Sequence, residues 1–92
     1  MLMQNSQQFL VASKTVNKLL TKPTDDELTE LYGLYKQATC GDNTQSKPFM
    51  IDFKGCVKWD AWTKYKGLDV YTSEIKYITL VNTLIKKYKL GI

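Results

Sequence analysis

The sequence predicts an all-α protein, a four-helix bundle in one domain that spans residues 1–92. In four separate segments, apolar residues recur at three- and four-residue steps, which is the spacing of an amphipathic helix. No segment shows the sustained alternation of apolar and polar residues that is typical of a strand. A chain of 92 residues also has room for only one thin hydrophobic core.

The first two helices are separated by a proline. The first is expected over residues 6–20, and Pro23 ends it because proline disfavours helical backbone at the residue before it. The second begins after Thr24, which has Glu27 three residues later in the pattern of a capping box. Gly41 and the polar residues after it close this helix. The apolar stripes are Phe9, Ala12, Val16, Leu19 and Leu20 in the first helix, and Leu28, Leu31, Tyr32, Leu34, Tyr35 and Ala38 in the second.

The last two helices follow a loop expected over residues 41–51. Asp52 is the expected cap of a short third helix that runs to about Lys66 and is stopped by Gly67. Asp69 is the expected cap of a fourth helix that runs to about Lys89. The apolar positions are Val57, Trp59, Trp62 and Tyr65 in the third helix, and Ile75, Ile78, Val81, Leu84, Ile85 and Tyr88 in the fourth.

Composition excludes several classes of function. All 13 basic residues are lysines, and the net charge is +4, which favours an anionic ligand or surface, although ordinary solubility also explains it. The absence of His removes the usual general base and the commonest metal ligand. The absence of Arg disfavours sequence-specific DNA reading. Cys40 and Cys56 are expected to be free thiols in a reducing compartment, so neither metal nor cofactor is expected.

The expected location is the cytoplasm. The first six residues carry no charged leader, and no stretch approaches the ~18–20 apolar residues that a membrane span needs.

The segment Tyr32-Gly33-Leu34-Tyr35-Lys36 is the first candidate for ligand chemistry. Tyr32 and Lys36 are four residues apart and share a helix face, where a phenol and an ammonium can donate to one phosphate. On spacing alone, two half-buried core tyrosines are the commoner explanation. Lys54 and Lys58 have the same four-residue spacing, and Tyr77 would either stack on a base or pack in the core.

Longer motifs point to a family. Tyr32-x-x-Tyr35-Lys36-Gln37-Ala38-Thr39 is followed by Gly41-Asp42, Pro48, Asp52-Phe53-Lys54-Gly55 and Lys58-Trp59-Asp60-Ala61-Trp62. Together with residues 21–25 and Lys86-Lys87-Tyr88, these runs resemble the acyl-CoA-binding protein family from about Phe9 to Tyr88. The resemblance implies an up-down-down-up four-helix bundle that carries long-chain fatty acyl-CoA and delivers it to enzymes by transient contact. It also implies a non-catalytic protein, and we expect a monomer.

The resemblance also assigns residues. It places Tyr32 and Lys36 on the 3′-phosphate of the CoA ribose, Lys58 near the phosphates and Lys54 at the ligand. Tyr35 and Tyr77 match the nucleotide site, whereas Phe9 and Leu28 match positions near the acyl chain. Asn17 stands where the family commonly has a lysine, so either Asn17 itself or Lys14 or Lys18 from a neighbouring turn would make that contact. Phe49 stands where the family often has glycine.

Two other classes stay open on the sequence. A basic helical module could bind nucleic acid through lysines and aromatic residues, although nine acidic residues interrupt any basic stripe. An enzyme, or a domain cut from one, would need a nucleophile and a base, and no such pair is visible.

Overall fold

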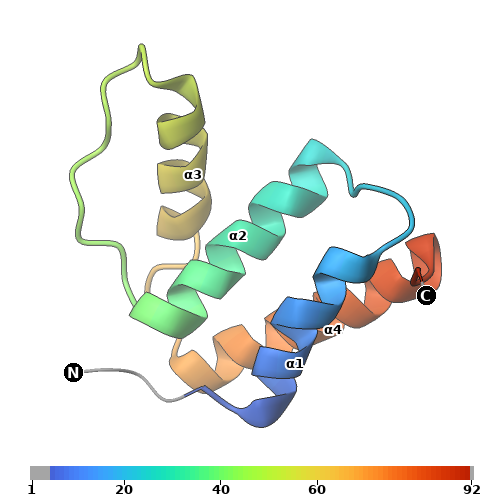
Figure 1. Cartoon of the computed structure of the whole chain (residues 1–92). Coiled ribbons are helices and arrows are strands. Elements are labelled where there is room, and N and C mark those ends of the chain that lie inside the picture. The colour runs from blue at the N-terminus through green and yellow to red at the C-terminus, as the bar shows by residue number, and fades with distance from the viewer. Residues whose placement is uncertain (1–4, 92) are drawn as a thin grey trace.

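The computed structural model describes residues 5–91, and within them the chain is helical. The elements are α1 (Gln7–Thr15), the short 3₁₀ helix η1 (Val16–Lys18), α2 (Asp25–Cys40), α3 (Phe53–Thr63) and α4 (Val70–Tyr88) (Figure 1). Extended pairing in residues 5–91 is limited to a single bridge between Leu19 and Leu90. The prediction of an all-α fold with four helices is therefore confirmed. The first six residues were expected to carry no leader, and residues 1–4 of this segment lie outside the described residues.

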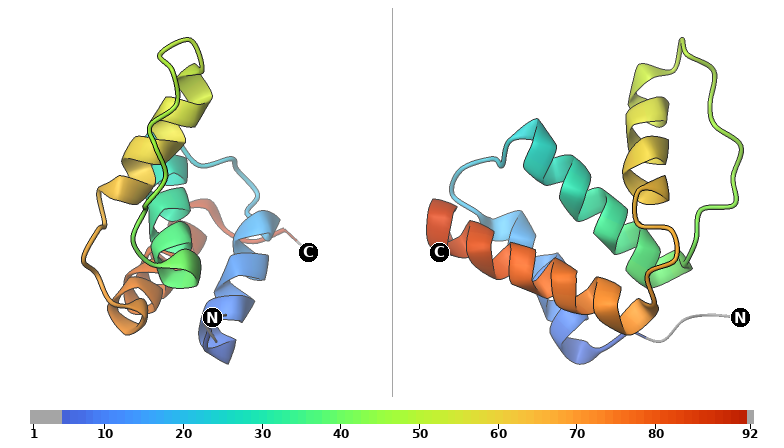
Figure 2. Two further views of the ribbon diagram at one scale, coloured as in Figure 1. Left: turned by 90° about the vertical axis from the view of Figure 1, so that its left-hand side faces the viewer. Right: turned by 180° about the vertical axis from the view of Figure 1, so that it is seen from behind.

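The four helices run in the expected up-down-down-up order. In Figure 1, α1 climbs, α2 and α3 both descend, and α4 runs back beneath α2. α4 packs against both α1 and α2, whereas α3 packs against α2 alone. The two further views show α3 standing at one end of the molecule, away from α1 (Figure 2). α2 is therefore the element that joins α3 to the rest of the bundle.

α1 is shorter than the sequence predicts. The α-helix ends at Thr15, η1 follows, and Leu19 is already extended with a ψ of 135°. The backbone there pairs with the C-terminal segment: Leu20 N donates to Lys89 O at 2.9 Å, and Gly91 N donates to Lys18 O at 2.7 Å. The expected helix over residues 6–20 is wrong at its C-terminal end, because this pairing takes the chain out of the helix before Pro23 does. Leu20, placed on the apolar stripe, is 66% exposed.

The start of α2 is tied to the end of α4. Thr24 Oγ1 accepts from Glu27 N, and Thr24 N donates to Glu27 Oε1, so the predicted capping box is confirmed. The same carboxylate accepts from Lys87 Nζ at 2.8 Å and from Tyr88 Oη at 2.6 Å. These bonds, led by the one from Lys87, lower the pKa of Glu27 to about 2.

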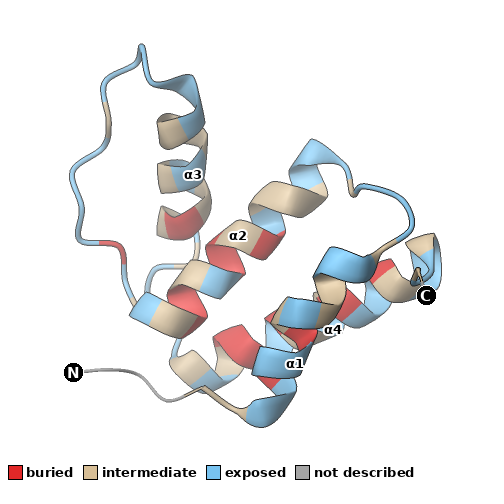
Figure 3. Ribbon diagram, in the orientation of Figure 1, coloured by how far each residue is buried: buried red, intermediate tan, exposed pale blue. Residues whose placement is uncertain are grey.

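The core lies between α1, α2 and α4, where the red segments of Figure 3 face one another. Its buried members are Phe9, Ala12, Leu31, Leu34, Ala38, Tyr77, Val81 and Leu84. Ile75, predicted to belong to the apolar stripe of the fourth helix, is exposed, because it lies in an open groove with Glu30 and Leu34 of α2 rather than in the core. Trp62 is buried outside this cluster, between α3 and the loop before it.

Two tryptophans hold the long loop over residues 41–52 against α3. Trp62 Nε1 donates to Gly41 O at 2.7 Å, and Trp59 Nε1 donates to Gln45 O at 2.8 Å. The Asn43 side chain, which is buried, donates to Thr63 Oγ1 at 2.9 Å. α3 ends at Thr63 rather than near Lys66, and a turn carries the chain to Gly67 at a φ of +94°. The loop is thereby part of the α3 end of the molecule.

Candidate functional site

An open groove lies between α2 and α3. Its volume is about 720 Å³, and we call it the α2–α3 groove. The lining residues are Asp25, Asp26, Leu28, Thr29 and Tyr32 from α2, and Phe53, Lys54, Val57 and Lys58 from α3. Leu28, Phe53 and Val57 give the groove an apolar surface. Lys54 and Lys58 give it positive charge along α3, one helical turn apart.

Tyr32 and Lys58 meet across this groove. Lys58 Nζ lies 5.6 Å from the centroid of the Tyr32 ring, within the range of a cation–π contact. Tyr32 is half-buried, and Lys58 is exposed. A phenol hydroxyl and an ammonium from two different helices therefore stand together at the groove, and both can donate hydrogen bonds to an anion.

Lys36 lies one helical turn from Tyr32 on α2, and like Tyr32 it faces α3. Its Nζ sits 4.7 Å from the centroid of the Trp62 ring, and the residue is not among those that line the groove. The helical spacing of Tyr32 and Lys36 led us to expect them on one ligand group. In the structure Lys58 lies over the Tyr32 ring and Lys36 lies over the Trp62 ring, so both lysines stand between α2 and α3.

Three aromatic rings from α1, α2 and α4 form a second cluster. The centroid of Phe9 lies 4.9 Å from that of Tyr77 and 5.7 Å from that of Tyr35. Phe9 is fully buried and Tyr77 is 4% exposed, whereas Tyr35 is 40% exposed. Burial, together with the nearby Tyr35, raises the pKa of Tyr77 to about 12, so its phenol stays neutral. Of the three rings, Tyr35 offers a face to which a flat base has access.

Of the two candidates near the end of α1, Asn17 lies beside the α2–α3 groove. Asn17 and Lys18 are exposed in η1, and the Asn17 amide donates weakly to Ser13 O at 3.4 Å. Asn17 lines a groove of about 320 Å³ together with Leu28. Because Leu28 lines both grooves, it connects the Asn17 region to the α2–α3 groove.

Gly33 and Leu34 belong to the packing of α2. Leu34 is 2% exposed in the core. A Cβ added at Gly33 would lie 2.2 Å from the carbonyl oxygen of Ala61, which is shorter than any normal contact. Gly33 therefore allows α3 to approach α2 closely, and this crossing fixes the wall of the α2–α3 groove.

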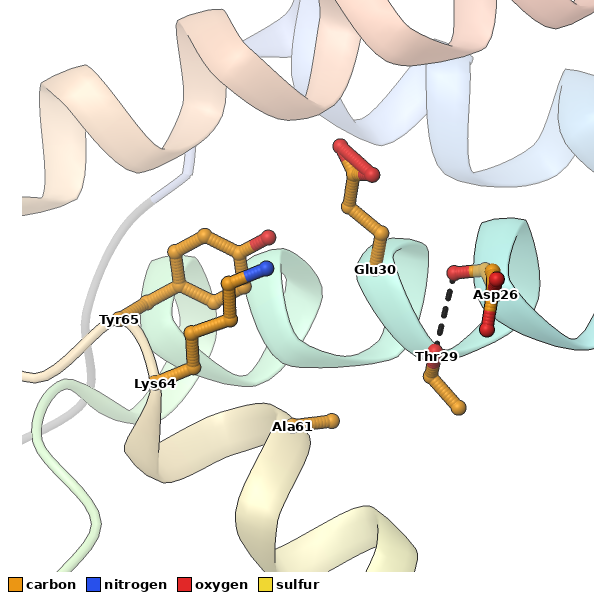
Figure 4. Close-up of a pocket in the computed structure, with 6 residues that line it drawn as sticks. All are labelled: Asp26, Thr29, Glu30, Ala61, Lys64 and Tyr65. Carbon is orange, nitrogen blue, oxygen red and sulfur yellow. Dashed lines mark hydrogen bonds between the residues drawn. The ribbon is translucent and has the colours of Figure 1, made fainter.

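A smaller pocket, also between α2 and the end of α3, is lined by both acidic and basic residues. It has a volume of about 310 Å³ and is shown in Figure 4 with its lining residues Asp26, Thr29, Glu30, Ala61, Lys64 and Tyr65. Thr29 Oγ1 donates to Asp26 O at 2.9 Å, so this hydroxyl is used within the helix. Two carboxylates against one lysine disfavour a phosphate there.

An apolar groove between α1 and α4 is an alternative for a hydrophobic ligand. Its volume is about 410 Å³, and its lining includes Val11, Ile78 and Ile85 but no lysine. The α2–α3 groove thus combines apolar and cationic walls, which the α1–α4 groove does not. Within residues 5–91, no group of three His, Cys, Asp or Glu side chains is placed to hold a metal ion, and both cysteines are free.

Sequence reasoning missed part of the groove lining. Phe53 and Val57 are four residues apart on α3, and each directly precedes one of the two lysines, Lys54 and Lys58. This spacing places an apolar pair beside the lysine pair, and it is the sequence signal that could have identified Phe53 and Val57 as groove residues. No such signal pointed to Asp25 or Asp26, whose positions in the groove depend on where α3 crosses α2.

Comparison with known protein families shows which family the chain belongs to. Residues 6–81 match the family described as "Acyl CoA binding protein", which is most of the chain. The chain belongs to the acyl-CoA-binding protein family. This family consists of binding proteins rather than enzymes.

Individual members of the acyl-CoA-binding protein family agree in length and fold. The chain is 52% identical over 83 residues to the acyl-CoA-binding protein of Saccharomyces cerevisiae, covering 90% of this chain and 95% of that one. It is 46% identical over 83 residues to a homologue from Drosophila melanogaster, covering 90% and 96%. The crystal structure of acyl-CoA-binding protein 2 from Oryza sativa superposes with a TM-score of 0.85 at 32% identity, covering 88% of each chain. The solution structure of an acyl-CoA-binding protein from yeast superposes with a TM-score of 0.73 at 50% identity, covering 92% of this chain and 99% of that one.

Among the described residues, none of the helices is both long enough and apolar enough to cross a membrane.

Proposed function

We propose that the protein binds long-chain fatty acyl-CoA esters in the α2–α3 groove and carries them inside the cell. The observation that supports this proposal is the pairing of Tyr32 with Lys58 at the side of a groove that also holds Leu28, Phe53 and Val57. An acyl-CoA has an anionic nucleotide end and an apolar tail, so its site needs both kinds of wall. Membership of the acyl-CoA-binding protein family supports the same ligand.

The proposed contacts follow from the chemistry of the walls. Tyr32, Lys54 and Lys58 would hold the phosphates of the CoA group, with Lys36 one turn along α2 as a further cation. Tyr35 would offer its exposed ring to the adenine. The acyl chain would lie against Leu28, Phe53 and Val57, and Asn17 or Lys18 would reach the ligand from η1.

The two ends contribute differently to affinity. Burying a tail contributes roughly 0.8 kcal/mol per CH₂, so a tail of about sixteen carbons contributes on the order of 10 kcal/mol before ordering costs. A hydrogen bond to a charged group contributes about 1.5–3 kcal/mol. The tail should therefore set most of the affinity, and the lysines should select CoA esters over free fatty acids.

Calorimetric titration with CoA, with palmitate and with acyl-CoA esters of rising chain length tests this proposal. We expect palmitoyl-CoA to bind far more tightly than CoA or palmitate, and the affinity to rise with chain length until the groove is filled. Equal affinity for palmitate and palmitoyl-CoA would contradict the role of the lysines. Binding to oligonucleotides that falls steeply with salt, without binding of palmitoyl-CoA, would favour the nucleic-acid module instead.

A further inference from the structure

The loop before α3 ends in a strongly apolar surface. Phe49, Met50, Ile51 and Phe53 are 87%, 92%, 94% and 75% exposed, and we call these four residues the apolar tip. Single exposed apolar residues are ordinary, but contiguous ones mark a surface that another molecule covers. We propose that the apolar tip inserts into the surface of a membrane that contains anionic lipids.

The apolar tip is built as an ordered turn with its side chains pointing outward. Asp52 N donates to Phe49 O at 2.9 Å, and the Cys56 thiol donates to the carbonyls of Pro48 and Phe49. Asp52 also accepts from Gly55 N and caps α3, so the turn is continuous with the helix. Since this backbone is already ordered, little backbone entropy remains to be lost when the side chains are buried.

The position of the apolar tip suits contact with a flat surface. The loop reaches its highest point just before α3 begins, at the end of the molecule farthest from α1 and α4 (Figures 1 and 2). Figure 3 shows this point as exposed and as a projection beyond the helices. A membrane surface can therefore reach the tip without meeting the rest of the bundle.

The charge around the apolar tip favours anionic lipid. Lys47, Lys54 and Lys58 surround it in the sequence, whereas Asp52 is the one acidic residue from 47 to 58. Lys47 pairs with Asp60 at 3.1 Å. Lys54 and Lys58 are exposed and form no ion pair with any residue that the structure describes. Apolar side chains with lysines behind them match the lipid headgroup region, where the chains enter the acyl boundary and the lysines meet anionic headgroups.

A protein partner fits this surface less well than a membrane does. A stable protein interface covers about 800 Å² on each partner and needs a matching surface. The apolar tip is a narrow projection of four side chains, and such a shape can sink into lipid without any complementary pocket. The tip also adjoins the α2–α3 groove, because Phe53 and Lys54 line it. If the groove holds acyl-CoA as proposed above, an acyl chain would have a short path between lipid and protein.

Vesicle co-sedimentation of the full chain without ligand tests the proposal. The vesicles are phosphatidylcholine alone or phosphatidylcholine mixed with phosphatidylserine. We expect binding to the mixed vesicles, weaker binding at high salt, and a loss of roughly tenfold or more for Phe49→Ser and for Ile51→Ser, since a large apolar side chain is no longer buried in lipid. Tyr71→Ser and Leu20→Ser remove apolar residues that are 72% and 66% exposed elsewhere, and these matched controls should bind as the original chain does.

A depth measurement shows which part of the chain enters the lipid. Met50→Trp and Tyr71→Trp share the background of Trp59 and Trp62, so the difference between them reports the added tryptophan. Brominated phosphatidylcholine in the mixed vesicles should quench Met50→Trp more than Tyr71→Trp. Affinity for palmitoyl-CoA without vesicles should be the same for Phe49→Ser and the original chain, because Phe49 does not line the groove. This result separates the tip from the acyl-CoA site.

Two results would overturn the proposal. The first is vesicle binding that is absent, or that Phe49→Ser and Ile51→Ser leave unchanged. The second is light scattering that shows self-association of the original chain, abolished by Phe49→Ser, without vesicle binding. That result would make a second copy of the chain the molecule that covers the apolar tip.

Discussion

Tyr32 and Lys58 show how a ligand site depends on residues that are far apart in the sequence. Each can be found as a candidate from its own motif, but the 5.6 Å contact between ring and ammonium depends on the crossing of α2 and α3. On the next turn of α2, Lys36 lies over Trp62 of α3 in the same way. Helical spacing placed Tyr32 and Lys36 on one face of α2, but it does not show which residues of α3 they meet.

Lys58→Ala should weaken binding of palmitoyl-CoA by about 1.5–3 kcal/mol, because one charged hydrogen bond to a phosphate is lost. The fold should be unchanged, since Lys58 is exposed. Lys64→Ala is the control, as it removes an exposed lysine of the same part of the chain that does not line the groove. Calorimetry measures both variants, and equal losses in the two would show that general charge, rather than this position, attracts the ligand.

Lys36→Ala addresses a position that the family resemblance assigned to the 3′-phosphate. If Lys36 reaches the ligand from beside Trp62, this variant should also weaken palmitoyl-CoA binding by about 1.5–3 kcal/mol while the fold stays intact. Calorimetry together with helical circular dichroism checks both parts. Unchanged affinity would assign Lys36 to its contact with Trp62 alone.

Gly33→Ala should destabilise the protein by about 1–3 kcal/mol, although alanine is the better helix former by about 1 kcal/mol. The reason is the carbonyl oxygen of Ala61, which lies 2.2 Å from the position that a Cβ would take. Urea unfolding measures the change, with Glu30→Ala on the exposed side of α2 as the control. A Gly33→Ala variant at least as stable as the original would mean that α3 is free to move away from α2.

Among the helices, the N-terminal caps were predictable and the ends of α1 and α3 were not. Thr24, Asp52 and Asp69 each accept from a backbone amide three residues later, which is a local interaction that the sequence displays. The end of α1 is decided by pairing with the backbone near Lys89, far along the chain. Exposure of Ile75 likewise depends on which side of α4 the other helices cover.

The bonds that Glu27 of α2 accepts from Lys87 and Tyr88 of α4 predict that the stability of the fold depends on pH. The pKa of Glu27 falls from 4.5 to about 2 in the folded chain, so the folded state binds fewer protons than the unfolded state between these values. The contribution of Glu27 to stability is therefore complete above pH 4.5 and is lost as the pH falls towards about 2. Urea unfolding across this range should show a smaller dependence on pH for Glu27→Gln than for the original chain. The same slope in both would show that Glu27 is not held by Lys87 and Tyr88.

The whole molecule consists of a three-helix core and a fourth helix, α3, that lies outside it. α1, α2 and α4 enclose the main hydrophobic core, and α3 packs against α2 alone. The α2–α3 groove and the apolar tip both lie at this outer part, where residues are not needed for the core. The all-helical class was predictable from periodicity because four amphipathic segments have few ways to bury their stripes. The position of α3 was not, since it depends on Gly33, on Trp62 and on how the loop is bonded.

The central claim is that acyl-CoA occupies the α2–α3 groove, and the backbone amide resonances test it most directly. In a titration with palmitoyl-CoA, we expect the largest shifts in residues that line this groove: Leu28, Tyr32, Lys54, Val57 and Lys58. Residues of the α1–α4 groove, such as Val11 and Ile78, should shift little. Shifts concentrated at Val11 and Ile78, with the α2–α3 groove unchanged, would contradict the claim.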